Sequence, residues 1–199
     1  DVRWRGPALD RLLDERHAAL VDVSVGGLVQ NGWETGVEVT YAVFGERGSI
    51  DVLGGHMDHR AVVVEEIKAD IVRMDDTIRK VDEKVRLVRR SIGRDHFGWQ
   101  PDHVGRVLVL PDTDRARRQV RAHAATLDVA FPARGAEVRA WLRAPVGPMA
   151  GILFVANISR GSATRSRVGI QRVRAARTGR RARDPVANIR AADERDDDA

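Results

Sequence analysis

The sequence contains no cysteine among its 199 residues, which excludes a disulfide framework and thiolate chemistry. No apolar run is long enough to span a bilayer, because Asp22 interrupts the longest candidate, and no secretory signal pattern opens the chain. Lysine is also scarce, since only positions 68, 80 and 84 carry it among 34 basic side chains, and all the others are Arg. We therefore expect a cytoplasmic protein with no membrane partner, in which Arg supplies most of the positive charge.

The formal net charge of +5 comes from the end of the chain. Residues 160–199 carry 11 Arg and 6 acidic residues, whereas residues 1–159 carry 23 basic and 23 acidic side chains. No sustained apolar periodicity follows Gly161, so we expect a folded domain over residues 1–158 and a disordered tail over residues 159–199, Arg-rich and then acidic. Such a tail either binds phosphates nonspecifically or solubilises the chain. The chain begins with Asp1 rather than Met, which suggests a piece of a longer reading frame.

Hydrophobic periodicity predicts the secondary structure. Apolar stripes predict helices over residues 8–31, 74–92, 114–127 and 137–143, with Asp114 as the N-cap of the third. Alternating or continuous apolar runs predict strands over residues 37–43, 49–53, 61–68, 105–112 and 151–155, with a loop over residues 54–60. The short connections make the first three strands an antiparallel meander. The predicted fold is an α/β sandwich with a mixed sheet between helices.

Four charged residues, Asp51, Glu65, Glu66 and Lys68, lie inside two of these apolar strands. Side chains alternate along a strand, so Glu66 and Lys68 share one face, and a tight meander can bring Asp51 beside them. Two bare carboxylates destabilise each other, and a hard divalent cation such as Mg²⁺ would resolve the conflict. Lys68 would then orient a water molecule and neutralise developing charge. The plainer alternative is a solvent-facing strand end with an ordinary ion pair.

Asp51 precedes the Glu66-Ile67-Lys68 triplet by fifteen residues, on an adjacent strand after a first helix, and this arrangement resembles the PD-(D/E)xK nuclease superfamily. The resemblance covers residues 8–128, and the order αβββαβ is similar to the restriction-endonuclease-like core. Segments such as "EEIKAD" and "VLVLPDTDRARRQV" also resemble an uncharacterised domain found behind an N-terminal helix-turn-helix in bacterial regulators. The resemblance implies Mg²⁺ or Mn²⁺ held by Asp51, Glu66 and the Ile67 carbonyl, with Lys68 assisting hydrolysis of DNA. Ile50 stands where the superfamily name has Pro.

Three further side chains are weaker candidates for the same site. Glu38 projects from the polar face of the first strand, Glu15 lies on the first helix, and Lys84 on the second helix could reach a phosphate. An exposed strand position explains Glu38 about as well, and a solvated helix face explains Glu15 better. Contacts with neighbouring acids on the helix explain Lys84 about as well. The "HMDH" segment at residues 56–59 lacks distant His or Cys partners at a recognised spacing, so we interpret it as a polar loop.

The sequence supports more than one function. The first hypothesis is a Mg²⁺-dependent nuclease acting on DNA, for which a homodimer would suit cleavage of two strands. The second is a catalytically inactive module of the same fold in a transcription regulator, joined to a helix-turn-helix domain in a longer chain. The third is a structural interaction domain with no role on nucleic acid.

Overall fold

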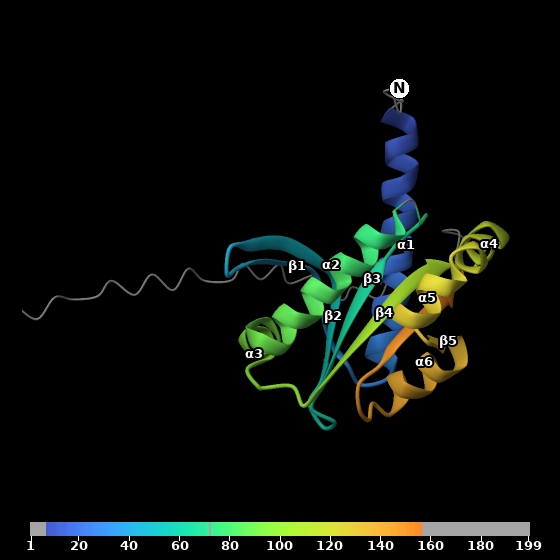
Figure 1. Cartoon of the computed structure of the whole chain (residues 1–199). Helices are drawn as coiled ribbons and strands as arrows, with labels where there is room; N and C mark the ends of the chain where they lie inside the picture. Colours follow the sequence, from blue (N-terminus) through green and yellow to red (C-terminus); the bar gives the residue numbers. More distant parts are fainter. Residues whose placement is uncertain (1–6, 72, 157–199) are drawn as a thin grey trace, which may run out of the picture.

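The computed structural model describes residues 7–71 and 73–156, which form a six-stranded mixed sheet flanked by helices (Figure 1). The prediction of an α/β fold is confirmed. The tail expected over residues 159–199 lies outside the described residues. In the described part of the chain, no helix combines the length and apolarity needed to cross a bilayer. The elements are, in chain order, α1 (Pro7–Gln30), β1 (Glu34–Val43), β2 (Glu46–His56), β3 (Ala61–Ile67), α2 (Met74–Leu87), the π-helical turn η1 (Val88–Ile92), α3 (Gly93–Phe97), β4 (His103–Pro111), α4 (Asp114–Ala122), α5 (Ala124–Ala130), β5 (Ala133–Arg134), α6 (Gly135–Arg143) and β6 (Ala150–Val155).

The strand order is β1-β2-β3-β4-β6-β5. Strands β1, β2 and β3 pair antiparallel, which confirms the predicted meander. The pairs β3–β4, β4–β6 and β5–β6 are parallel, so helical crossovers connect β3 to β4 and β4 to β6. Because parallel strands need such crossovers, helices cover both faces of the sheet.

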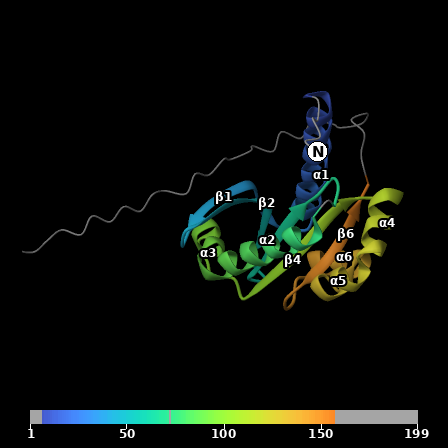
Figure 2. The ribbon, with the colours of Figure 1, turned by 45° about the horizontal axis from the view of Figure 1, so that its top comes forward.

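Helices α1 and α6 cover one face of the sheet, and α2, α3, α4 and α5 lie on the other (Figure 2). On the first face, Leu20 and Leu28 of α1 pack in one cluster with Val63 of β3 and Val107 of β4. On the second face, Leu87 at the end of α2 packs with other buried side chains of β2 and β3, while α4 and α5 cover β4 and β6. Strand β3 is buried along its whole length, so both of its charged residues lie inside the protein.

Several element boundaries differ from the sequence-based expectations. The helix expected over residues 74–92 is α-helical only to Leu87. It is followed directly by a π-helical turn and by α3, and Gly98, whose φ of 79° is left-handed, ends the helical segment. Asp114 does not cap α4, because the Thr113 hydroxyl accepts the Ala116 N–H at 3.2 Å. Strand β2 extends to His56, into the predicted loop. The helix expected over residues 114–127 is two helices, and the short strand β5 was not predicted.

In strands β1 and β2, the apolar side chains switch from one face of the sheet to the other, at the same level in both strands. Val37 and Val52 pack on the α1 side, whereas Val39 and Ile50, two residues away along each strand, pack on the α2 side. Regular strands would place such residues on one face. Residues 38 and 51 lie between the pairs Val37↔Val52 and Val39↔Ile50 and are not paired with each other in the ladder, and Glu38 has a left-handed φ of 49°. The break in alternation therefore falls at Glu38 and Asp51.

Candidate functional site

Asp51 of β2 and Glu66 of β3 come together on the α2 side of the sheet. The ladder between their strands ends at the pair Val52↔Glu65, and Asp51 and Glu66 are the next residues of the two strands. The Asp51 carboxylate turns toward the end of β3, where Oδ2 accepts the Ile67 backbone N–H at 2.7 Å. The sheet itself therefore fixes the position of this carboxylate.

Two lysines neutralise the pair of acids. Lys84 of α2 donates from Nζ to Glu66 Oε2, and the same Nζ lies 3.7 Å from Asp51 Oδ1. Lys68, just after β3, lies 2.7 Å from Glu66 Oε1. Glu66 and Lys84 are almost fully buried, with 2% and 7% of their side-chain surface exposed, while Lys68 keeps 35%. The four residues therefore form a compact cluster with two negative and two positive charges, open to solvent on the Lys68 side.

The surroundings of the cluster shift the pKa values of Asp51 and Glu66 in opposite directions. Burial alone would raise the pKa of Glu66, but the ammonium groups of Lys84 and Lys68 outweigh burial and hold this pKa below its ordinary value. Burial and the Glu66 carboxylate raise the pKa of Asp51, against the opposing effects of Lys84 and the Ile67 N–H. Glu66 therefore stays ionised, and Asp51 is the acid that more readily takes up a proton.

The hairpin of β1 and β2 is tied to the helix that carries Lys84. The Tyr41 hydroxyl donates to Glu83 Oε1 at 3.0 Å, and Arg86 pairs with Glu46 at 2.6 Å. Burial, the hydrogen bond to Glu83 and nearby carboxylates, Glu66 among them, raise the pKa of Tyr41 to about 12. Tyr41 was missed by the sequence analysis, because strand alternation gives its face but not its partner on α2. These contacts hold α2 over the carboxylates.

Glu65 lies on the opposite side of the sheet from the cluster. It is 1% exposed, and its Oε2 accepts a hydrogen bond from the Ser24 hydroxyl of α1. Burial raises the pKa of Glu65 to about 7, although the Ser24 hydroxyl acts in the opposite direction. The predicted split of Glu65 and Glu66 between two faces is confirmed by these contacts.

The remaining candidates are less closely connected to the cluster. Glu38 is exposed and stands at the level of Asp51 in the β1–β2 register, while Glu15 is exposed on α1, which covers the other face. His56 packs edge-on against Trp33 and His59. Among residues 7–71 and 73–156, no group of three or more His, Asp or Glu side chains is arranged to hold a metal ion. A metal at the cluster would thus depend on two carboxylates and a backbone oxygen, as the sequence analysis implied.

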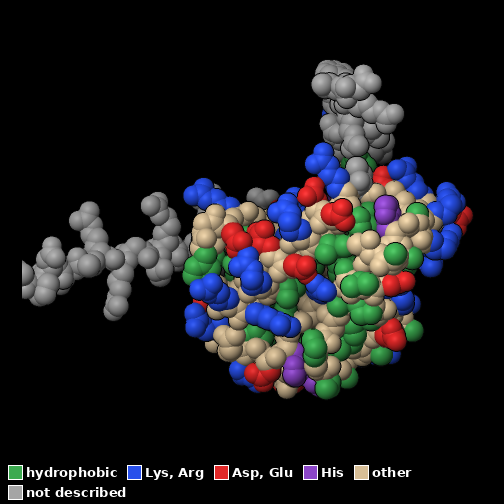
Figure 3. All heavy atoms as spheres, in the orientation of Figure 1, with side chains coloured by type: hydrophobic (Ala, Val, Ile, Leu, Met, Phe, Trp, Pro, Cys, Tyr) green, Lys and Arg blue, Asp and Glu red, His purple; other side chains and the backbone are tan. Residues whose placement is uncertain are grey.

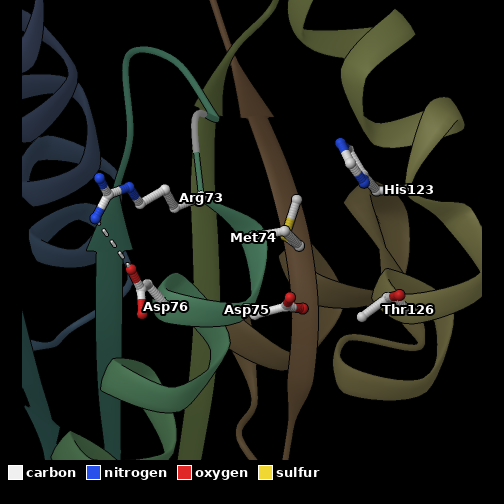
Figure 4. Close-up of a pocket in the computed structure, with 6 residues that line it drawn as sticks. All are labelled: Arg73, Met74, Asp75, Asp76, His123 and Thr126. Carbon is white, nitrogen blue, oxygen red and sulfur yellow. Dashed lines mark ion pairs between the residues drawn. The ribbon is translucent and has the colours of Figure 1, made fainter.

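A shallow hollow of about 500 Å³ lies elsewhere, at the start of α2 (Figure 4). Figure 4 shows Met74 and Asp75 facing His123 and Thr126 across it, with Arg73 paired to Asp76 at 3.7 Å. Most of the lining side chains are exposed, and none belongs to the Asp51–Glu66 cluster. The hollow therefore adds no chemical group to the candidate site.

No protein-family model, curated protein or solved structure matches this chain. The resemblance to the PD-(D/E)xK superfamily stays a prediction from the sequence. What the geometry adds is that Asp51, Glu66 and Lys68 lie together and that Lys84 joins them.

Proposed function

We propose that the protein is a metal-dependent phosphodiesterase that hydrolyses DNA at the Asp51–Glu66–Lys68 cluster. The observation that supports this function best is the meeting of two carboxylates and a partly exposed ammonium on neighbouring inner strands of a mixed sheet, at the end of β3. Carboxylates from neighbouring strands beside a lysine fit the chemistry of phosphodiester hydrolysis, in which positive groups stabilise the charge that develops on phosphate oxygens.

The donor atoms of the cluster suit a hard divalent cation. Asp51 Oδ1 lies 3.7 Å from Lys84 Nζ, and Glu66 offers a second carboxylate on the same side. Mg²⁺ and Mn²⁺ prefer such oxygens and tolerate few protein ligands. Asp51, Glu66 and the Ile67 carbonyl would hold the ion, and its chemistry there is to lower the pKa of water and withdraw charge from a phosphoryl oxygen.

The residues of the chain divide the remaining tasks. Glu66, ionised and fixed by Lys84, keeps a negative charge at the centre of the cluster. Lys68 places an ammonium group at the solvent-open side, where it can orient a water molecule and neutralise a phosphate oxygen. Asp51 is held in position by the Ile67 N–H, which donates to its Oδ2.

The surface around the cluster favours an anionic polymer as substrate. The segment 86–94, from the end of α2 into α3, carries four exposed Arg and no acidic residue, and two of them, Arg86 and Arg94, pair with acids outside the segment. Figure 3 shows Lys and Arg side chains, with Asp and Glu side chains among them, over the side of the molecule that α2 and α3 form. Arg side chains placed this way contact phosphates without reading sequence, and binding through them weakens with salt.

The test is cleavage of single- and double-stranded DNA by the purified chain with Mg²⁺ or Mn²⁺. Glu66→Gln and Lys68→Met should each abolish cleavage, because one removes a carboxylate and the other the solvent-facing ammonium. Glu65→Gln is the matched control, since it alters a buried carboxylate of the same strand on the opposite face. Absence of cleavage by the folded wild-type protein on both DNA forms with both metals refutes the proposal.

A second candidate function is a catalytically inactive DNA-binding module of a regulator. The position of Lys84 favours it, because this ammonium and that of Lys68 together already neutralise Asp51 and Glu66 without any metal. This candidate predicts salt-sensitive DNA binding that survives Lys68→Met, and no heat of Mn²⁺ binding in calorimetry, with or without DNA. Cleavage that depends on Lys68 would decide for the enzyme.

A further inference from the structure

The charges of the cluster balance without a metal ion. Asp51 and Glu66 contribute two negative charges, and Lys68 and Lys84 contribute two positive charges within direct reach of them. Lys84 is the decisive partner because its Nζ contacts Glu66 and lies 3.7 Å from Asp51, with only 7% of its side chain exposed. The ammonium of Lys84 thus occupies the place between the carboxylates where a cation gains most.

Adding a dication alone would leave this partly dry cluster with two uncompensated positive charges. Repulsion between like charges is strong where water is excluded, so Lys84 should keep the affinity for a divalent ion low. A phosphodiester adjacent to the cluster brings one negative charge and offers Lys84 a new acceptor. Lysine can make this exchange because its ammonium is a compact charge on a flexible stem of four carbons.

We propose that a divalent cation and a phosphodiester anion bind to this cluster cooperatively, with Lys84 as the resident cation that opposes metal binding in the absence of nucleic acid. The inference rests on the proposed function for the identity of the ligands, and it concerns binding rather than cleavage. Cooperative binding is reciprocal, so the metal must raise the affinity for the nucleic acid by the same factor that the nucleic acid raises the affinity for the metal.

The experiment titrates Mn²⁺ into the full chain by calorimetry, with and without a saturating phosphorothioate oligonucleotide that resists hydrolysis. We expect Mn²⁺ to bind roughly tenfold or more tightly when the oligonucleotide is present. The matched control is an oligonucleotide of the same sequence with methylphosphonate linkages, which are uncharged and should give no such gain. Equal Mn²⁺ affinity with and without the charged oligonucleotide overturns the inference, and this measurement needs no variant.

Lys84→Met removes the resident charge at similar side-chain length. This variant should bind Mn²⁺ alone roughly tenfold more tightly than the wild type and should lose most of the coupling. Lys84→Arg keeps a positive charge and should retain weak binding of Mn²⁺ alone. A folded Lys84→Met protein that binds Mn²⁺ no more tightly than the wild type contradicts the role given to Lys84. Coupled binding without DNA cleavage would refute only the proposed function, and cleavage without coupling would refute only this inference.

Discussion

The carboxylate of Asp51 accepts the backbone N–H of Ile67 at 2.7 Å, across from β2 to the end of β3. At this level the ladder between the two strands has ended at Val52↔Glu65, and the Asp51 side chain takes the place of a carbonyl acceptor. The same residue therefore replaces a backbone acceptor at the end of the β2–β3 ladder and faces Lys84 with its other oxygen. Asp51 thus has a structural role at the Ile67 N–H and a candidate role in the site, and different substitutions are needed to test each role separately.

Asp51→Ala should lower the free energy of unfolding by about 1–3 kcal/mol, because it leaves the Ile67 N–H without its acceptor in a largely buried place. Asp51→Asn retains an amide oxygen as acceptor and should lose clearly less. Urea unfolding of both variants measures the difference. Asp58→Ala, at an exposed carboxylate in the turn after β2, is the control and should change stability little. Equal losses in the Ala and Asn variants would contradict the structural role. For this reason Asp51→Asn is the cleaner probe of catalysis.

Glu66→Gln should destabilise the protein by about 3–5 kcal/mol near neutral pH, because it leaves the buried Lys84 ammonium without its closest anion. The pKa of Glu66 is lower in the folded protein than its ordinary value of 4.5, so its contribution is fully present above that value. As the pH falls through the folded pKa, the wild type loses this contribution. The difference between wild type and variant should therefore shrink in acid, as unfolding curves at pH 7 and pH 3.5 can measure. A stability difference that grows in acid would contradict the lowered pKa of Glu66 in the folded protein.

Part of the cluster follows from sequence rules and part does not. Alternation along β3 correctly places Glu66 and Lys68 on one face and Glu65 on the other, because only the period of a strand is needed. The short connections of the meander bring Asp51 near Glu66 for the same local reason. Lys84 could not be assigned in this way, since its contact depends on how α2 is rotated against the sheet, which packing of the whole core decides.

The hairpin illustrates a second limit of the sequence analysis. A run of alternating residues predicts one unbroken strand, yet Glu38 has a left-handed φ and the apolar side chains change face on either side of it. No local signal marks this position, because glycine and asparagine are the residues that favour such backbone angles. The face change becomes visible only when the packing partners of Val37 and Val39 are known.

Glu65 should make the stability of the protein depend on pH in the opposite sense to Glu66. Its pKa is raised from 4.5 to about 7 in the folded state, so the folded protein binds the extra proton between these values. Stability from this group is present below about pH 4.5 and falls by about 3 kcal/mol as the pH rises past 7. Glu65→Gln cannot ionise, so its stability relative to the wild type should increase over the same interval, as urea unfolding from pH 4.5 to 8 measures.

Ser24→Ala provides the matched test for Glu65. The Ser24 hydroxyl stabilises the ionised carboxylate, so its loss should raise the pKa of Glu65 further and steepen the fall of stability with pH. If the stability of the wild type changes with pH in parallel with that of Glu65→Gln from pH 4.5 to 8, the raised pKa of Glu65 is contradicted.

Tyr41 is the only tyrosine in the chain, so its ionisation can be followed by absorbance without interference from another phenol. Its pKa is raised from 10.0 to about 12 by burial, by donation to Glu83 and by nearby carboxylates. We expect a titration midpoint near 12 in the folded protein and near 10 in concentrated urea. Because the folded pKa lies above the unfolded value, stability should fall as the pH rises beyond about 10.

Glu83→Gln tests the physical cause of this shift. It replaces the charged acceptor of the Tyr41 hydroxyl with a neutral one, so the folded midpoint should move down toward 10. Lys80→Met, on an exposed position of the same helix, should leave the midpoint unchanged. Near-UV circular dichroism of the tryptophans establishes that the protein is folded at each pH. A wild-type midpoint near 10 in protein that is still folded would mean that α2 does not hold Glu83 against Tyr41, and the placement of Lys84 over the carboxylates would lose its support.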